Sequence, residues 1–149
     1  MSDTFSKLFF HVVFSTKERI KFLKPDLRVR LFEYMGGIAK NNNFQTVFTN
    51  GIDDHLHTLL LLKPNMAVSK AVQLLKGGSS KWIHDNFSDL KMFTWQSGFG
   101  AFSVSHSQVE KVIEYISKQE EHHKKMDFKD EYKKLLKINN IDYKEQYLF

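Results

Sequence analysis

The sequence predicts an α+β domain with a ferredoxin-like arrangement, in which helices cover one face of an antiparallel sheet. The chain has 149 residues, the size of one domain, and 42% of them are hydrophobic, which is enough for a buried core. Strand-type and helix-type segments follow in the order β-α-β-β-α-β-α, and the first six match the βαββαβ plan. The additional C-terminal helix is then free to cover the open face of the sheet.

Four segments have the composition of strands. Residues 5–17 are rich in Phe and Val, which is typical of a buried strand. Residues 44–52 and 55–63 predict a hairpin, because an Asn-Gly pair and an Asp-Asp pair near their junction provide turn residues. Residues 93–105 predict a further strand or a strand pair.

Helical spacing marks the remaining core segments. Apolar residues recur every three or four positions in residues 24–43, and an Asn run ends that helix. Residues 63–87 predict a loop and then a helix that a Gly-Gly pair interrupts. Residues 105–125 form the clearest helix, and 126–149 predict short helical or coil segments.

Charge and composition limit the class of protein. The net charge of +5 belongs entirely to residues 1–119, because residues 120–149 hold seven lysines and seven acids. A basic body suits a polyanionic ligand, and a basic protein without such a ligand is an equal alternative. The chain has no cysteine, which excludes disulfides and thiolate metal sites. The first residues lack a signal-peptide pattern, so we expect a soluble intracellular protein.

A pair of histidines begins the strand at 55–63. Residues two apart point to the same face of a strand, so His55 and His57 can offer two nitrogen ligands to one divalent ion. In the helix at 105–125, Tyr115 and Gln119 lie one turn apart. A Gln oxygen with two imidazoles suits Mn²⁺ or Mg²⁺, and also Zn²⁺, and leaves open positions for a phosphate oxygen. Tyr115 would then be placed to attack the phosphorus.

These motifs resemble those of a known family. The sequence "DHLH" followed by "TLLLL" resembles the His-hydrophobic-His motif of HUH nucleases, and "YISKQ" resembles that of their single-tyrosine subgroup. This subgroup comprises the transposases of small insertion sequences, the insertion-sequence 200-like proteins, and their repeat-associated relatives. Three more segments resemble the family's opening strand and basic loop, its central helix and its approach to the tyrosine helix. They are "HVVFSTKERIKFL", "AVSKAVQLLKGGSSKWI" and "WQSGFGAFSVSHSQVEKVIEYISKQEEHH".

The resemblance implies a transposase that nicks and transfers single-stranded DNA through a covalent 5′-phosphotyrosine intermediate. It implies that His55, His57 and Gln119 hold Mg²⁺ or Mn²⁺ and that Tyr115 is the nucleophile. It also implies hairpin recognition, a homodimer in which one subunit's tyrosine helix can complete the other's site, and a cytoplasmic protein that joins the nucleoid on DNA. We expect a catalytic domain at 1–128. The tail at 129–149 has no clear family pattern and either belongs to the same domain or is peripheral.

Most of the further polar residues have two possible roles. Asp53 and Asp54 either accept a hydrogen bond from an imidazole or serve the turn. His11 is expected on the open side of the sheet. His122 either assists near the metal or is a surface residue. Six basic residues either contact DNA phosphates or form a solvated surface: Lys17, Arg19, Lys21, Lys70, Lys76 and Lys81.

Two other functions compete with the transposase. One is a domesticated protein that binds hairpin DNA without transposition. The presence of all four catalytic residue types argues against a loss of chemistry and not against a changed role in the host. The other is an RNA-binding ferredoxin-like module, which stacks bases on sheet aromatics. Such a module would not require His55, His57 and Gln119 to converge.

Overall fold

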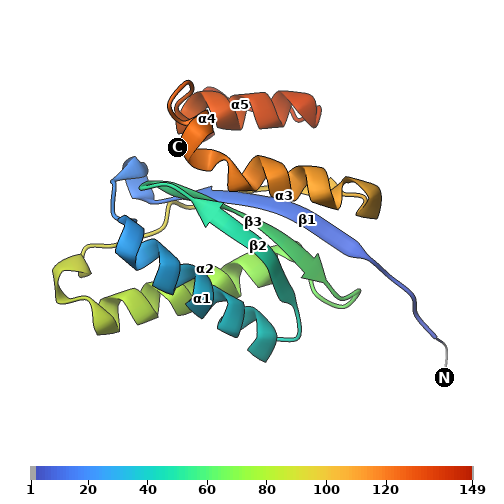
Figure 1. Ribbon diagram of the computed structural model, residues 1–149, viewed down its shortest axis with the longest axis horizontal. Helices are drawn as coiled ribbons and strands as arrows, with labels where there is room; N and C mark the ends of the chain where they lie inside the picture. Colours follow the sequence, from blue (N-terminus) through green and yellow to red (C-terminus); the bar gives the residue numbers. More distant parts are fainter. Residues whose placement is uncertain (1–2, 149) are drawn as a thin grey trace.

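A computed structural model describes residues 3–148 and confirms the ferredoxin-like plan (Figure 1). Within these residues one antiparallel sheet has the strand order β2-β3-β1-β4. Its strands β1 and β3 are central, so their side chains face a layer of helices on either side. The strands are β1 (Leu8–Ser15), β2 (Gln45–Gly51), β3 (His55–Leu62) and β4 (Gly100–Val104).

Helices α1 (Pro25–Asn41) and α2 (Val68–Asn86) cover one face of the sheet, as Figure 1 shows. Their apolar sides meet the sheet in the main core, where Leu31, Leu60 and Leu75 have no exposed surface. This layer builds the fold and lies on the side away from the two histidines of β3.

The predicted interruption of α2 at Gly77 and Gly78 is wrong, because the helix runs through both glycines. A Cβ atom added at Gly78 would lie 2.7 Å from Ile38 Cδ1 of α1. The missing side chain therefore lets the two helices approach closely. This packing offsets the cost of a glycine inside a helix, which is about 1 kcal/mol.

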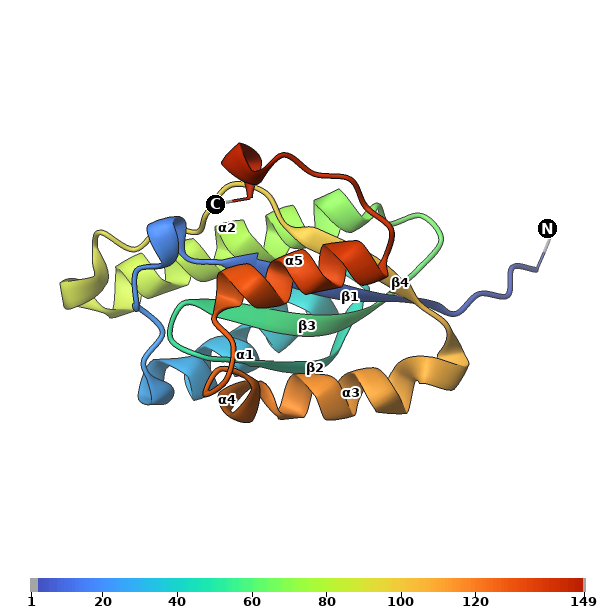
Figure 2. The same cartoon turned by 90° about the horizontal axis from the view of Figure 1, so that it is seen from above.

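The other face of the sheet is covered by the C-terminal helices, which Figure 2 shows from above. Ile116 packs against Phe9 and Leu59, and a second cluster on this face joins Phe128 to Phe102 of β4. The helix predicted over 105–125 therefore covers this face, and a further helix over 128–138 lies beside it. The helices are α3 (Val109–Ser117), α4 (Gln119–His122) and α5 (Phe128–Ile138).

Two predicted elements are shorter than expected. The strand predicted over 93–105 covers only 100–104, because Gly98 turns the chain with φ +86° and Trp95 makes only an isolated bridge to Thr16. The helix predicted over 105–125 is broken at Lys118, where φ is −102° and ψ is 23°. Short 3-10 helices occur at Lys17–Arg19, Ser88–Leu90, His106–Gln108 and Glu145–Tyr147.

Among the helices of residues 3–148, none combines the length and the apolar character that a membrane span requires.

Candidate active site

Two buried histidines project from β3 toward the C-terminal helices. His55 and His57 pair with Ser15 and Val13 of β1, and neither histidine has any exposed surface. Leu56 between them joins the main core on the opposite face, because successive side chains of a strand alternate. The strand geometry thus places both imidazoles on the face that α3, α4 and α5 cover.

Each imidazole is oriented by a hydrogen bond at Nδ1. His55 Nδ1 lies 2.8 Å from Asp54 Oδ1, and His57 Nδ1 lies 2.8 Å from His11 Nε2. His11 is itself buried on the same face of β1. Partners of this kind fix the ring orientation of histidine ligands, and they leave both Nε2 atoms available for a second contact.

Gln119 follows the break at Lys118 as the first residue of α4, and it has no exposed surface. Its Oε1 lies 3.1 Å from His55 Nε2. Asn50 of β2 donates from Nδ2 to the carbonyl oxygens of Ile116, at 3.0 Å, and Ser117, at 3.3 Å. Because these carbonyls lie at the end of α3, where helical partners are lacking, Asn50 stabilises the break.

Tyr115 lies half-buried on α3 among the rings of the site. Its ring centroid is 5.8 Å from that of His57 and 5.9 Å from that of His11. On its other side it stacks on His122 at 4.8 Å. The hydroxyl donates a hydrogen bond to the carboxylate of Glu131. The phenol oxygen therefore points toward the histidine pair.

Glu131 of α5 completes the cluster, and sequence reasoning missed it. This residue is 3% exposed. Its Oε1 lies 3.1 Å from His57 Nε2 and 3.4 Å from His55 Nε2. The same oxygen is 3.0 Å from His123 Nε2. Its Oε2 accepts a hydrogen bond from Gln119 Nε2 at 3.0 Å, as well as that from Tyr115.

A signal for Glu131 was present in the sequence. Phe128, Tyr132 and Leu135 recur at helical spacing and form the apolar side of α5, and Glu131 falls on that side. A carboxylate on the buried stripe of an amphipathic helix requires a buried partner. His123 offered no such signal, because it lies in a charged stretch.

The three buried histidines differ in how their surroundings shift their pKa values. Burial, with a smaller effect from His57, lowers the pKa of His11 to about 3, and burial lowers the pKa of His57 to about 4. Burial also opposes the charged form of His55, but hydrogen bonds to Asp54 and Glu131 outweigh it and raise the pKa of His55.

Their surroundings hold Glu131 as an anion and Tyr115 as a neutral phenol. Burial opposes the anionic form of Glu131, yet its hydrogen bonds to the surrounding imidazoles hold its pKa well below the ordinary range. Burial and the adjacent Glu131 charge raise the pKa of Tyr115. The phenol is therefore protonated beside an ionised carboxylate, and phenolate formation requires compensating positive charge in the cluster.

The cluster has the donor set of a metal site. Ligand atoms of His55, His57 and Glu131 all lie within 4.8 Å of one another, and all three residues are buried. Gln119 Oε1 adjoins them. Two imidazole nitrogens with carboxylate and amide oxygens suit Mn²⁺ or Mg²⁺ and can also hold Zn²⁺. These residues fit the divalent ion that the motifs imply.

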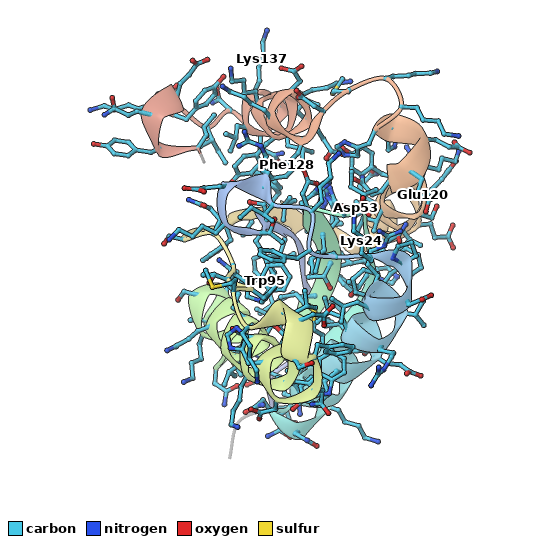
Figure 3. The ribbon with its side chains drawn as sticks, turned by 90° about the vertical axis from the view of Figure 1, so that its left-hand side faces the viewer. Lys24, Asp53, Trp95, Glu120, Phe128 and Lys137 are labelled. Atoms are coloured by element: carbon cyan, nitrogen blue, oxygen red, sulfur yellow. The ribbon has the colours of Figure 1, made fainter. Side chains whose placement is uncertain are left out.

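Asp53 does not contact an imidazole. Its Oδ1 accepts a hydrogen bond from Arg28 at 2.8 Å, and its Oδ2 lies 3.9 Å from Lys24. Arg28 also lies 3.5 Å from Glu120. Figure 3 shows Lys24, Asp53 and Glu120 on the same side of the molecule. Of the two predicted acceptors, Asp54 has this role and Asp53 joins α1 to the β2–β3 turn.

The six basic residues fall into two groups. Lys17, Arg19 and Lys21 follow β1 at the end of the sheet where His55 begins β3. Lys21 lines a cavity of about 350 Å³ together with His123.

The other three lie on α2, across the sheet from the cluster. Lys76 donates to the carbonyl oxygens of Gln96, at 2.8 Å, and Gly98, at 2.6 Å, and burial lowers its pKa to about 8. Lys81 pairs with Asp85 at 2.7 Å, and Lys70 is exposed.

A smaller cavity borders Tyr115. It has a volume of about 190 Å³ and lies between α3 and α5, with Tyr115 and Glu131 in its wall. Lys125 and Lys134 line the same cavity. A phosphate group entering there would meet two ammonium groups and the phenol.

Known proteins match this chain over most of its length. The family described as "Transposase IS200 like" matches residues 4–119. The transposase of insertion sequence IS200 from Salmonella typhimurium is 28% identical over 120 residues, which are 77% of this chain and 78% of that protein.

Two solved structures share the fold. A putative transposase from Deinococcus radiodurans superposes with a TM-score of 0.66 and 25% identity, covering 80% of this chain and 95% of that one. A REP-associated tyrosine transposase bound to a REP hairpin superposes with a TM-score of 0.61 and 16% identity, covering 83% and 74%. The sequence motifs, the fold and these matches agree, and the chain belongs to the IS200-like transposase family.

Proposed function

We propose that this transposase cleaves single-stranded DNA by attack of the Tyr115 phenol on a phosphodiester. A bond forms between the phenol oxygen and phosphorus, the bond to the 3′ oxygen breaks, and that oxygen takes up a proton. The products are a 5′-phosphotyrosine link and a free 3′ hydroxyl, which keeps the bond energy for strand transfer. The observation that carries the proposal is the convergence of Tyr115, His55, His57 and Gln119 in one buried cluster.

In this proposal His55, His57 and Gln119 hold a divalent cation, Mg²⁺ or Mn²⁺. The cation supplies positive charge that polarises a phosphate oxygen. The protein supplies orientation, because Asp54 and His11 fix the two imidazoles. Tyr115 donates its hydrogen bond to Glu131, which is the nearest acceptor for the phenol proton during attack.

The proposed substrate is a DNA hairpin with an adjoining single strand. The basic body and the cluster of Lys17, Arg19 and Lys21 near His55 favour a polyanion. The structural relative with a bound REP hairpin supports the same class of ligand. We further propose that the protein acts as a homodimer and that residues 129–149 belong to the catalytic domain, because α5 carries Glu131 into the site.

The competing RNA-binding function has less support. It leaves the convergence of His55, His57 and Gln119 unexplained, and α3, α4 and α5 cover the sheet face on which such modules stack bases. A protein that only binds hairpins would keep the fold, and it would not need the phenol beside the imidazoles.

A covalent adduct tests the proposal. Hairpin oligonucleotides incubated with the protein and Mn²⁺ should give a complex that survives denaturation, and Tyr115→Phe should abolish it while DNA binding remains. Tyr34→Phe is the matched control, because Tyr34 stacks on Trp82 in the opposite layer and should give the wild-type yield. An undiminished adduct in Tyr115→Phe would reject Tyr115 as the nucleophile.

A further inference from the structure

Glu131 contacts all four residues of the proposed nucleophile and metal site, although it lies outside the segment that matches the family. The match ends at residue 119, and Glu131 is on α5. One carboxylate oxygen lies within 3.4 Å of the Nε2 atoms of both His55 and His57. The other accepts hydrogen bonds from Gln119 and Tyr115. No other carboxylate described in residues 3–148 has this set of partners.

We propose that Glu131 is a ligand of the divalent cation, so that α5 supplies part of the metal site. This inference rests on the proposed function, since it concerns the same cation. With Glu131 the site would offer two nitrogen and two oxygen ligands to the cation, which would leave room for phosphate oxygens or water. The second oxygen of Glu131 remains beside Tyr115, which links the position of the nucleophile to that of the metal.

The burial of Glu131 supports this assignment. An ionised carboxylate in an apolar layer is costly unless opposite charge or several hydrogen bonds compensate it. Here the compensation comes from three imidazoles, those of His55, His57 and His123. A divalent cation held by the first two would meet the oxygen that already lies between them. The anionic charge is therefore in place for a cation.

Helix α5 is built to hold Glu131 in this position. Asp127 caps the helix by accepting a hydrogen bond from the Asp130 backbone at 2.9 Å. The Phe128 ring stacks on His55 with centroids 4.4 Å apart, on the side of α5 that faces the sheet (Figure 3). Leu136 is buried in the cluster with Phe102. These contacts hold both ends of α5 without using the carboxylate of Glu131.

Direct metal binding tests the inference. Mn²⁺ would be titrated into the full chain by calorimetry, with the free ion followed by electron paramagnetic resonance. Glu131→Gln keeps the shape of the side chain and should weaken Mn²⁺ binding tenfold or more, which is at least the loss seen when a supporting residue is removed. Asp130→Asn removes the same charge one residue away, on the exposed side of α5, and should change the affinity less than twofold.

The position of α5 gives a second readout, independent of activity. Trypsin can cut at the exposed Lys124 and Lys125 between α4 and α5. If Glu131 binds the cation, Mn²⁺ should slow this cleavage in the wild-type protein and in Asp130→Asn, but not in Glu131→Gln. Circular dichroism of the metal-free variants establishes that each is folded. A folded Glu131→Gln protein that Mn²⁺ protects as well as the wild type would overturn the inference.

The outcomes separate this inference from the proposed function. If His55→Ala abolishes Mn²⁺ binding and Glu131→Gln leaves it unchanged, the metal site stands and Glu131 is not a ligand. If the wild-type protein does not bind Mn²⁺ at all, the metal-dependent function fails with it. If Glu131→Ala raises the adduct yield at unchanged Mn²⁺ affinity, the carboxylate occupies the place of the DNA phosphate, and the assignment as a ligand is wrong.

Discussion

The stability of the metal-free protein should fall on mild acidification because of two buried histidines. His11 and His57 have pKa values of about 3 and about 4 in the fold, lowered by burial, against about 6.5 in the unfolded chain. Below pH 6.5 the unfolded chain binds two protons that the native protein does not. Each proton lowers the free energy of unfolding by about 1.4 kcal/mol per pH unit. Because the unfolded histidines are only half protonated at pH 6.5, the two histidines together should cost about 3 kcal/mol between pH 6.5 and pH 5.

Other buried groups of the cluster do not cancel this loss in the same window. The raised pKa of His55 contributes stability that is fully present below pH 6.5 and is lost as the pH rises through its folded pKa. The lowered pKa of Glu131 contributes stability above about pH 4.5, and this is lost only as the pH falls further, toward its folded pKa. Neither contribution changes much between pH 6.5 and pH 5.

Urea unfolding in the presence of a chelator measures the effect at half-unit steps from pH 7 to pH 5. His11→Phe replaces the ring by one that does not titrate, and it should roughly halve the dependence of stability on pH below 6.5, whatever its effect at pH 7. Phe9→Leu, two residues earlier on the same face of β1, is the control and should keep the full dependence. Equal slopes in wild type and His11→Phe would refute the reasoning.

Three further predictions concern the helices that carry the site. Ile116→Ala should lower the free energy of unfolding by about 3 kcal/mol in urea, because a fully buried side chain between Phe9 and Leu59 is lost; a loss below 1 kcal/mol would contradict this packing. Asn50→Ala should cost about 1 kcal/mol and reduce the adduct yield, because the carbonyls at the end of α3 lose their donor; Asn42→Ala, which loses a bond at the end of α1, should leave the yield unchanged. Gln119→Ala should weaken Mn²⁺ binding measured by calorimetry, while circular dichroism shows an intact fold. An unchanged Mn²⁺ affinity would show that Gln119 is not a ligand of the cation.

The order of elements could be predicted because local pattern and burial agree in this chain. β1 and β3 are mostly apolar in sequence and buried on both faces, and they are central strands between two helical layers. The placement of His55 and His57 on one face followed from the two-residue period of a strand. The position of Tyr115 near Gln119 followed from helical spacing, although the helix proved to be broken between them.

The structural features that could not be predicted from the sequence depend on contacts between distant segments. Glu131 is 74 residues from His57, and no local pattern shows that α5 crosses over that histidine. The break at Lys118 depends on the Asn50 side chain of β2. An interruption of α2 was predicted at Gly78 because the local sequence does not show that Ile38 of α1 packs against this glycine. In each case the deciding partner lies on another element.

The most direct test of the account is the chemical identity of the DNA adduct. The Mn²⁺-dependent complex with a hairpin oligonucleotide would be digested with trypsin and nuclease and analysed by mass spectrometry. We expect a nucleotide joined through its 5′ phosphate to the peptide that contains Tyr115, together with a DNA fragment that ends in a 3′ hydroxyl. Cleaved DNA with a free 5′ phosphate and no tyrosine-linked peptide would show that water is the nucleophile and that Tyr115 is not.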